Sequence, residues 1–451
     1  MAVKILESHS VSPSSGAGGE NTLPLLYFDI IWLDFLLVDS LRFYPLKCSQ
    51  SHFLDTILVN LKHSLSLTLN HFLPLSSKII FPLSSSATPV SRYTAGDSLS
   101  LTIATSDDDF SHVVSNRPKP AHDFHQLVPQ MPAAVYSSDE IKFSPLAIQL
   151  TLFPNQGICI AFTLHHSICD ATTLSAFIHT WASINRSNGG DHLLNQLPFY
   201  GRDSVQDSTK LTIAEWNKMK ANRPTVSLTL PLPSDRVRAT FHLTDPQIEK
   251  LKALAIIKKP STGRPSTFVV ACAYLWSCLA KSEVDNDNNN NNDETEYLSF
   301  AVNCRGRLNP PLPENYFGNC LIQLFAASSR ARLKGNEGFV AAAEAVADAV
   351  KSAAKSSRVS EFYENRLEIF SKLNGKRVVW VVGSSKLDPY GVDYGWGRAV
   401  KFECAHTDSH RAVHLCKARK GGIDIGFSMP KPNMHSFASV FNEYLFINCN
   451  L

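Results

Sequence analysis

His166 and Asp170 lie four positions apart in the run 164–170, which reads Leu-His-His-Ser-Ile-Cys-Asp. Apolar residues alternate before this run, and His166 is in phase with Ile158, so its side chain points to the apolar face of a strand while His165 points the other way. Partial desolvation lowers the pKa of an imidazole and keeps it neutral at pH 7, the state that a general base for an alcohol or thiol requires. We therefore predict that His166 is a general base and that Asp170 carries a charge in need of a partner.

Two other interpretations of this run compete with catalysis. A histidine at a strand end is often a hydrogen-bonded structural residue, and the His-x-x-x-Asp spacing recurs by chance. A metal site is the second, because His165, His166, Cys169 and Asp170 all have ligand chemistry. Since the two histidines face opposite ways and no second His/Cys cluster completes four ligands, we predict that the chain binds no metal.

The elements that must position His166 are a hairpin and a helix. Residues 148–152 and 158–164 alternate in polarity around the turn Pro-Asn-Gln-Gly at 154–157, which predicts two antiparallel strands. After Asp170, apolar residues recur at three- and four-residue spacing, which predicts an amphipathic helix over 174–184. His166 is thus expected on a strand-to-helix turn at the edge of a core.

Length and composition exclude several classes of protein. The 451 residues can form two or three domains, and 44% hydrophobic with 18% charged residues is ordinary for a globular protein. A net charge of +3 gives no reason to expect a nucleic-acid or membrane partner. Residues 1–21 lack the apolar stretch of a signal peptide, and ten cysteines without a Cys-x-x-Cys pair indicate reduced thiols, so we expect a cytoplasmic location.

Strands and helices mix along the rest of the chain, which indicates an α/β (mixed α+β) protein. Helices are predicted at 53–72, 245–256, 268–279, 338–354 and 435–445, and strands at 99–103, 238–243, 298–302, 378–382 and 424–429. The tract 191–233 has little periodicity and is predicted to be a linker between two halves. The asparagine run Asn288–Asn292 is expected to be a surface loop without a catalytic role.

Two further motifs are each unspecific alone, but their order along the chain is more specific. Residues 303–313 (Asn-Cys-Arg-Gly-Arg-Leu-Asn-Pro-Pro-Leu-Pro) precede Tyr-Phe-Gly-Asn-Cys at 316–320, and Asp-Tyr-Gly-Trp-Gly follows at 393–397. With His-x-x-x-Asp and the early segment Leu-Pro-Leu-Leu-Tyr-Phe-Asp-Ile-Ile-Trp-Leu at 23–33, this order resembles the plant BAHD acyl-CoA-dependent acyltransferases. The branch it looks like is the malonyltransferase-like one that acylates anthocyanin, flavonoid and phenolic glucosides.

The resemblance implies two chloramphenicol acetyltransferase-like domains, each with a mixed sheet flanked by helices and with a channel at their interface. We expect these domains at 1–190 and 234–451. It also implies a monomer without a bound cofactor that uses acyl-CoA as co-substrate and a small glycoside as acceptor. His166 would be catalytic in mid-channel, and Asp170 would point away from the chemistry and pair with Arg305.

The resemblance leaves the walls of the channel to be assigned. Ser384, Ser385 and Trp396 are candidates for the oxyanion or the channel, since a tetrahedral oxyanion needs hydrogen-bond donors. Trp32 and Phe35 are candidates for an aromatic acceptor pocket.

The acyl donor is the least determined part of the prediction. Malonyl-CoA is favoured by the branch, and its carboxylate needs a cation. Because Ala-Thr-Thr at 171–173 offers none, Arg398 and Lys401 are the candidates for binding it. A hydroxycinnamoyl donor for the same acceptors is the alternative, and a non-catalytic ligand-binding homologue is the alternative of another class. A serine hydrolase is disfavoured because the sequence has no Gly-x-Ser-x-Gly elbow.

Overall fold

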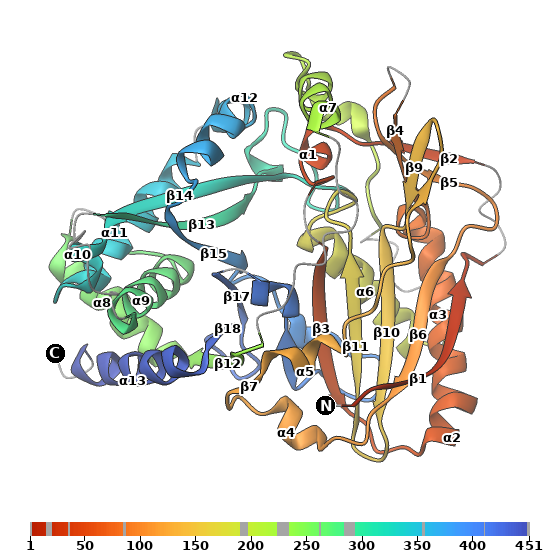
Figure 1. Cartoon of the computed structure of the whole chain (residues 1–451), viewed down its shortest axis with the longest axis horizontal. Coiled ribbons are helices and arrows are strands. Elements are labelled where there is room, and N and C mark those ends of the chain that lie inside the picture. The colour runs from red at the N-terminus through yellow and green to blue at the C-terminus, as the bar shows by residue number, and fades with distance from the viewer. Residues whose placement is uncertain are drawn as a thin grey trace.

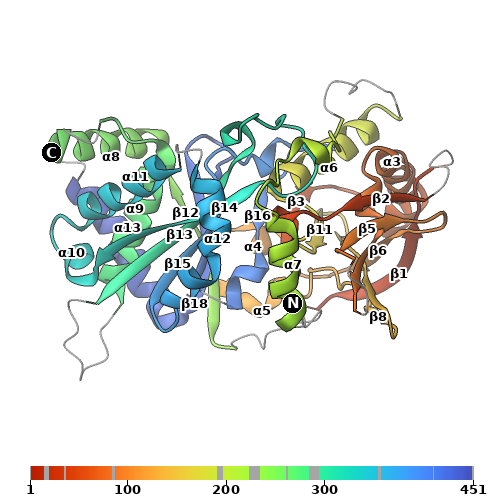
Figure 2. The same cartoon turned by 90° about the horizontal axis from the view of Figure 1, so that it is seen from above.

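The computed structural model describes residues 2–14, 20–34, 37–83, 87–189, 197–222, 234–260, 263–283, 294–353, 357–409 and 411–448. Within these residues, two halves lie side by side, each built on its own large sheet (Figure 1). Figure 2 shows the same pair from above, with the helices near the C-terminus at one end of the molecule and α3 with β1 at the other. The architecture is the mixed α/β class predicted from the sequence.

The larger sheet of the N-terminal half is built around the predicted hairpin. Its strand order among the described residues is β1-β6-β10-β11-β3-β16, and β10 pairs antiparallel with β11 from Leu146↔Leu164 to Phe153↔Gly157. The bounds are β1 Lys4–Val11, β3 Val38–Pro45, β6 Leu99–Thr105, β10 Leu146–Phe153, β11 Gly157–Leu164 and β16 Lys401–Glu403. A smaller sheet beside it contains β2 Asn21–Pro24, β4 Lys78–Pro82, β5 Val90–Tyr93, β8 Val135–Tyr136 and β9 Glu140–Phe143.

The sheet of the C-terminal half has the order β14-β13-β15-β17-β18-β12-β7 within the described chain. The bounds are β7 Lys119–Pro120, β12 Arg236–Leu243, β13 Thr295–Asn303, β14 Leu321–Ser329, β15 Arg377–Gly383, β17 Ala412–Lys417 and β18 Ile423–Pro430. The strands predicted at 238–243, 298–302, 378–382 and 424–429 are confirmed. The sequence analysis did not predict β14 or β17.

The helices cover the outer faces of these sheets. Leu61 and Leu65 of α3 join Phe177 and Trp181 of α6 in one core, while Trp276 of α9 lies in the core of the other half. The bounds are α1 Tyr27–Ile30, α2 Gln50–His52, α3 Leu58–His71, α4 Phe110–Val114, α5 Ala121–His125, α6 Ala171–Arg186, α7 Leu211–Asn222, α8 Asp245–Lys258, α9 Thr267–Ser282, α10 Arg330–Lys334, α11 Gly338–Ser352, α12 Ser357–Lys372 and α13 Lys431–Asn448. Short turns add the π-helix η1 Phe53–Ile57 and the 3-10 helices η2 Leu73–Leu75, η4 Arg202–Ser204, η6 Arg305–Arg307, η7 Pro389–Gly391 and η8 Ala405–Ser409.

The two halves exchange short strands, so they are not the continuous segments 1–190 and 234–451 that we expected. β16 pairs antiparallel with β3 of the N-terminal sheet, and β7 pairs antiparallel with β12 of the C-terminal sheet. The buried Arg238 of β12 ties this exchange together, because its guanidinium binds Glu403 at 2.9 Å and Asp408 at 2.5 Å. Such exchanges depend on pairing between distant segments, which the order of elements along the chain does not reveal.

Two other expectations also need correction or stay open. The tract 191–233 is more than a linker, since it contains η4 and the helix α7. The run Asn288–Asn292 lies outside the described residues. Across the residues that were searched, no helix is both long and apolar enough to cross a membrane.

Candidate active site

A cavity of about 1670 Å³ lies between the two halves, and His166 forms part of its wall. The N-terminal half contributes Trp32, Val38 and one side of α6, while the C-terminal half contributes residues of β13, β14 and β15. The hairpin predicted from the sequence ends at Leu164, and α6 begins at Ala171, so His166 lies on the strand-to-helix turn, as predicted. Such a cleft between domains is where ligand sites are most often found.

The imidazole of His166 is held between an aromatic ring and an amide. The indole of Trp32 stacks on it, with 4.1 Å between ring centroids and 17° between the planes. Burial lowers the pKa of His166 below its usual 6.5, and Asp170 and Asn319 only partly oppose that effect. The ring is therefore neutral and basic at pH 7.

Asn319 determines which nitrogen of His166 carries the proton. The Nδ2 group of Asn319 donates to the backbone carbonyl of His166 at 2.9 Å and to Oδ1 of Asp29 at 3.0 Å, so the amide cannot be flipped without losing both bonds. Its oxygen Oδ1 therefore faces Nδ1 of His166 at 3.1 Å and accepts a hydrogen bond from it. With the proton on Nδ1, Nε2 is the nitrogen of His166 that carries the basic lone pair.

Asp29 and Arg202 support this amide from behind. Asp29 is fully buried at 0% exposure, and its Oδ1 also accepts the backbone N–H of Asn319 at 3.0 Å. Burial raises the pKa of Asp29, while the Arg202 guanidinium, 3.6 Å away, acts in the opposite direction. Arg202 in turn donates to the carbonyl of Phe317 at 3.0 Å. The early aromatic segment, the segment before α7 and the Tyr-Phe-Gly-Asn-Cys motif thus meet behind His166.

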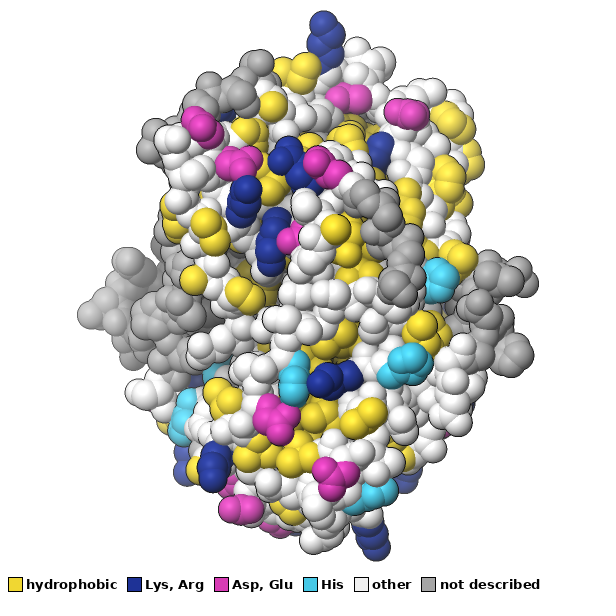
Figure 3. Space-filling model, turned by 90° about the vertical axis from the view of Figure 1, so that its right-hand side faces the viewer, with side chains coloured by type: hydrophobic (Ala, Val, Ile, Leu, Met, Phe, Trp, Pro, Cys, Tyr) yellow, Lys and Arg dark blue, Asp and Glu magenta, His cyan; other side chains and the backbone are white. Residues whose placement is uncertain are grey.

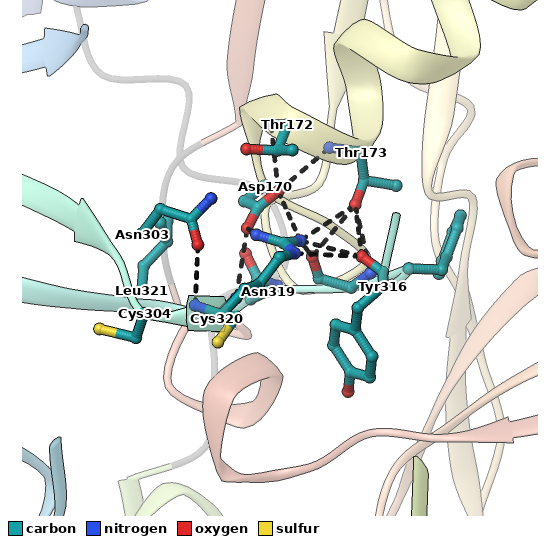
Figure 4. Close-up of polar contacts among 12 residues, drawn as sticks. Asp170, Thr172, Thr173, Asn303, Cys304, Tyr316, Asn319, Cys320 and Leu321 are labelled. Atoms are coloured by element: carbon teal, nitrogen blue, oxygen red, sulfur yellow. Dashed lines mark hydrogen bonds and ion pairs between the residues drawn. The ribbon is translucent and has the colours of Figure 1, made fainter. Parts of the chain in front are cut away.

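Asp170 is fully occupied by structural contacts (Figure 4). Arg305 donates to it through both terminal nitrogens, at 2.7 Å to Oδ2 and 3.1 Å to Oδ1. Oδ1 also accepts the backbone N–H groups of Thr172 and Thr173, which caps α6, and Oδ2 accepts that of Cys320. A carboxylate with five such contacts anchors the turn that carries His166 and does not take part in proton transfer.

The neighbours of His166 do not offer another reactive centre. His165 is buried and packs against Phe143 with ring centroids 4.6 Å apart, while its Nδ1 and the hydroxyl of Ser167 are 2.8 Å apart. Burial lowers the pKa of His165 to about 3. Burial, with Asp170 beside it, raises the pKa of the Cys169 thiol well above its usual value. A search of the described residues for groups of three or more His, Cys, Asp or Glu side chains able to hold a metal found none.

The candidates for the channel wall are placed in different regions. Ser384, Ser385 and Trp32 line the cavity. Trp396 does not, because the turn at 393–397 packs at the far end of α6, where Asn185 donates to the carbonyl of Tyr394 at 2.7 Å. Since α6 is 16 residues long, that end is roughly 24 Å from His166, and Trp396 is too far away to bind the oxyanion. Phe35 lies outside the described residues.

The two cations proposed for the donor carboxylate do not line the cavity. Arg398 is exposed beside Asp393 in the turn that follows Trp396. Lys401 is buried at 2% exposure, where it donates to Asn116 at 2.7 Å and to Thr240 at 2.5 Å and lies 3.1 Å from Glu403. A buried ammonium with three partners cannot reach an acyl group, so this expectation was wrong.

Four residues of this site were not singled out from the sequence. Asp29 belongs to the early segment 23–33, which contributed only to the family resemblance, and the large side chains beside it are buried. Asn319 lies within a motif used only for the family resemblance, and Arg202 lies in the presumed linker. His406, which lines the cavity from η8, has no motif around it. The sequence offered one signal for these residues, which is Asp29 itself, because an acidic residue within an apolar segment needs a partner.

Comparison with known proteins places the chain in a family. The model of the Transferase family matches residues 1–444. The chain is 36% identical over 451 residues to phenolic glucoside malonyltransferase 1 of Nicotiana tabacum, covering 97% of this chain and 98% of that protein. It is 32% identical over 450 residues, with 97% of each chain covered, to coumaroyl-CoA:anthocyanidin 3-O-glucoside-6''-O-coumaroyltransferase 2 of Arabidopsis thaliana.

Solved structures agree on the fold. Vinorine synthase superposes with a TM-score of 0.71 at 20% sequence identity, and the match covers 96% of both chains. This likeness concerns the fold alone, and it agrees with the two-sheet arrangement that brings His166 to the cavity. The family model matches nearly the whole chain, and the His-x-x-x-Asp turn faces the cavity between the halves. The chain therefore belongs to the Transferase family, the BAHD acyl-CoA-dependent O-acyltransferases.

Proposed function

We propose that this protein transfers an acyl group, malonyl in the first place, from acyl-CoA to a sugar hydroxyl of a flavonoid, anthocyanin or phenolic glucoside. The observation that carries the reaction type is the neutral His166 in the wall of the cavity, with its proton fixed on Nδ1 so that Nε2 is the basic nitrogen. The names of the relatives from Nicotiana tabacum and Salvia splendens, both malonyltransferases, favour the malonyl donor.

The reaction follows from the position of His166. Nε2 takes the proton of the acceptor hydroxyl while the oxygen forms a bond to the thioester carbonyl carbon. The tetrahedral oxyanion then collapses, the carbon–sulfur bond breaks, and the departing CoA thiolate takes the proton from His166. Such general-base help contributes about 10²–10⁴-fold to the rate.

Direct transfer requires no acyl-enzyme. Both substrates meet in one cavity, so their proximity replaces a covalent intermediate. Cys169, the thiol nearest to His166 in sequence, is buried with a raised pKa and is therefore a poor nucleophile. His166 thus acts on the acceptor directly.

Ser384 is the better placed of the serine candidates for the oxyanion. Its Oγ accepts the backbone N–H of Lys386 at 3.2 Å, which fixes the oxygen and leaves the hydroxyl hydrogen to be donated. Ser385 lines the same part of the cavity. A donor held in place by the backbone stabilises the developing charge with little rearrangement.

One wall of the cavity is aromatic. Phe300 and Trp380 of the C-terminal sheet and Phe362 and Phe370 of α12 form one wall, and Trp32 lies beside His166. Flat aromatic side chains suit a flavonoid or phenolic ring. The same wall would also suit a hydroxycinnamoyl donor, which keeps that alternative open.

A cytosolic monomer is part of the proposal. The nine cysteines within the described residues are free and buried, as expected for a reducing compartment. On the face drawn in Figure 3, basic and acidic side chains are intermixed, which does not favour nucleic acid as a partner.

The test is transfer by the purified protein. Malonyl-CoA and coumaroyl-CoA are each incubated with a panel of flavonoid and phenolic glucosides, and esters are detected by mass spectrometry. A malonyl ester is the expected product. A coumaroyl ester alone would establish the alternative donor, and tight binding of a glucoside without ester formation from either donor would establish a non-catalytic homologue.

A further inference from the structure

Two further histidines line the same cavity as His166: His179 on α6 and His406, which lies past the end of β16. His406 lies in η8, and its side chain is 16% exposed. The backbone N–H of Asp39 donates to its Nδ1 at 3.1 Å, and the carboxylate Oδ1 of Asp39 lies 3.4 Å from the same nitrogen. Since Nδ1 accepts a hydrogen bond, the neutral ring carries its hydrogen on Nε2, and the protonated ring carries one there as well.

The strand register brings the two histidines to the same edge of one sheet. β11 and β16 both pair antiparallel with β3, so they run in the same direction. At the end of β11, Leu164 is opposite Val38, and His166 follows two residues later. At the end of β16, Glu403 is opposite Leu41, and His406 follows three residues later. The two chain paths are two strand spacings apart, roughly 10 Å, which leaves room for a short acyl group between the rings.

The electrostatics of the cavity agree with this geometry. Burial is the main cause of the lowered pKa of His166, and a charge on His406 lowers it further. The Asp39 side chain, 7% exposed, lies on the side of the His406 ring away from Nε2 and also accepts the N–H of Ala405 at 2.6 Å. Asp39 therefore holds the His406 ring at Nδ1, on the side away from Nε2.

The lysines and arginines of the described cavity wall are less suited to a carboxylate beside His166. Lys218 and Arg366 both bind Glu215, at 2.8 Å and 2.6 Å. Arg307 donates to the carbonyl of Asn303, and Lys386 is exposed on the loop after β15. In a malonyl group, the carboxylate carbon is two bonds from the thioester carbonyl carbon that the acceptor oxygen attacks. Because His166 must lie beside that oxygen, the side chain that binds the carboxylate must also lie near His166.

We propose that His406, held by Asp39, binds the terminal carboxylate of a dicarboxylic acyl-CoA and selects that donor over uncharged acyl groups. The inference rests on the proposed acyl transfer and names the recognition group for its donor. The contact is a charge-assisted hydrogen bond from Nε2–H to the ionised carboxylate, with Asp39 holding the ring at Nδ1. A desolvated malonyl carboxylate without such a partner would bind poorly.

The test compares malonyl-CoA with acetyl-CoA on one glucoside acceptor. For each donor, kcat/KM is measured for the wild type, His406→Leu, His406→Gln and Asp39→Asn, with His122→Leu at an exposed position of α5 as the matched control. We expect the malonyl-to-acetyl ratio of kcat/KM to fall at least tenfold in His406→Leu. His406→Gln, which keeps an N–H donor, and Asp39→Asn, which keeps the backbone N–H contact to Nδ1, should give smaller falls in that ratio, and His122→Leu should retain the wild-type ratio.

Several outcomes would overturn the inference. One is an unchanged ratio in all three variants, and another is an equal loss with both donors, which would assign His406 to the oxyanion or to folding. If His406→Leu does not fold, the other two variants decide. Kd values of malonyl-CoA and acetyl-CoA, measured by calorimetry, separate this inference from the proposed function. A wild type that transfers neither group refutes the proposed function. If the wild type binds malonyl-CoA more tightly than acetyl-CoA and His406→Gln does not weaken that preference, the inference is refuted.

Discussion

Asp29 holds Asn319 through a single carboxylate oxygen, because Oδ1 accepts both the backbone N–H and the side-chain Nδ2–H of Asn319 at 3.0 Å. The two residues are 290 positions apart in the chain. Their contact fixes the amide whose oxygen faces Nδ1 of His166, so an acid without contact to the cavity determines the tautomer of the base. The motif residue Asn319 therefore has a physical role in positioning His166.

Replacement of Asn319 by alanine should lower kcat about tenfold, the effect of one lost hydrogen bond of roughly 1–1.5 kcal/mol to the reacting imidazole. KM for acyl-CoA should change little, since Asn319 orients His166 and does not bind the donor. Asn315→Ala is the matched control, because Asn315 is exposed and donates to the carbonyl of Leu197. A loss of kcat in both variants, or in neither, would contradict the positioning role.

His166→Ala should lower turnover by at least ~10²-fold, the low end of what a general base contributes. The variant should still fold, which circular dichroism and thermal unfolding can verify. His165→Asn should retain far more activity, because His165 packs against Phe143 on the other side of the turn. Near-normal turnover by His166→Ala would end the mechanism proposed for this site.

The pH dependence of kcat/KM should show an acid limb below pH 6.5. Burial lowers the pKa of His166, so the free enzyme keeps the base neutral at pH values where an exposed histidine is half protonated. Activity is therefore present above the lowered pKa and is lost as the pH falls through it. A limb centred at or above 6.5 would show that His166 is not the titrating base or is not desolvated.

The local part of this site was predictable and the distant part was not. The hairpin, α6 and the direction of His166 follow from period-2 and period-3.6 patterns within one stretch of about 40 residues. Arg305 could be suggested because a charge such as Asp170 needs a partner and the motif order supplied one. The pairing of Asp29 with Asn319 and of Asp39 with His406 links segments hundreds of residues apart, which no periodicity encodes.

The misplaced residues were wrong for a related reason. Trp396 lies in the conspicuous turn at 393–397 and Lys401 follows it, and sequence proximity to that turn was taken as proximity to the site. The register of β16 against β3 instead buries Lys401 beside Glu403, and the length of α6 separates Trp396 from His166. Only the strand exchange between the halves determines these positions.

Asp170→Asn should destabilise the protein by about 3–5 kcal/mol, because it leaves the fully buried guanidinium of Arg305 without its counter-charge. The double variant Asp170→Asn with Arg305→Met should recover part of that loss, since an unpaired buried charge costs more than the absence of both charges. Denaturant unfolding of the four proteins in the cycle measures both effects. A single variant that unfolds like the wild type but has no activity would instead assign Asp170 to the chemistry.

His414 should make the stability of the protein depend on pH. Its ring is 2% exposed, and within the described residues neither ring nitrogen has a hydrogen-bond partner. Burial lowers its pKa to about 4. In the unfolded chain the pKa is near 6.5, so between these values the unfolded state binds a proton that the folded state does not, and stability falls as the pH falls by about 1.4 kcal/mol per pH unit.

Replacement of His414 by phenylalanine removes this proton uptake while keeping a flat ring beside Phe402. The difference in unfolding free energy between His414→Phe and the wild type should therefore shift in favour of the variant by about 2–3 kcal/mol from pH 7 to pH 4.5. Urea unfolding at pH 7, 6, 5 and 4.5 measures that shift, and the exposed His122→Gln provides the control for losing a histidine. Parallel curves for His414→Phe and the wild type would mean that His414 titrates equally in the folded and unfolded states, and that its burial has no influence on the acid sensitivity of the fold.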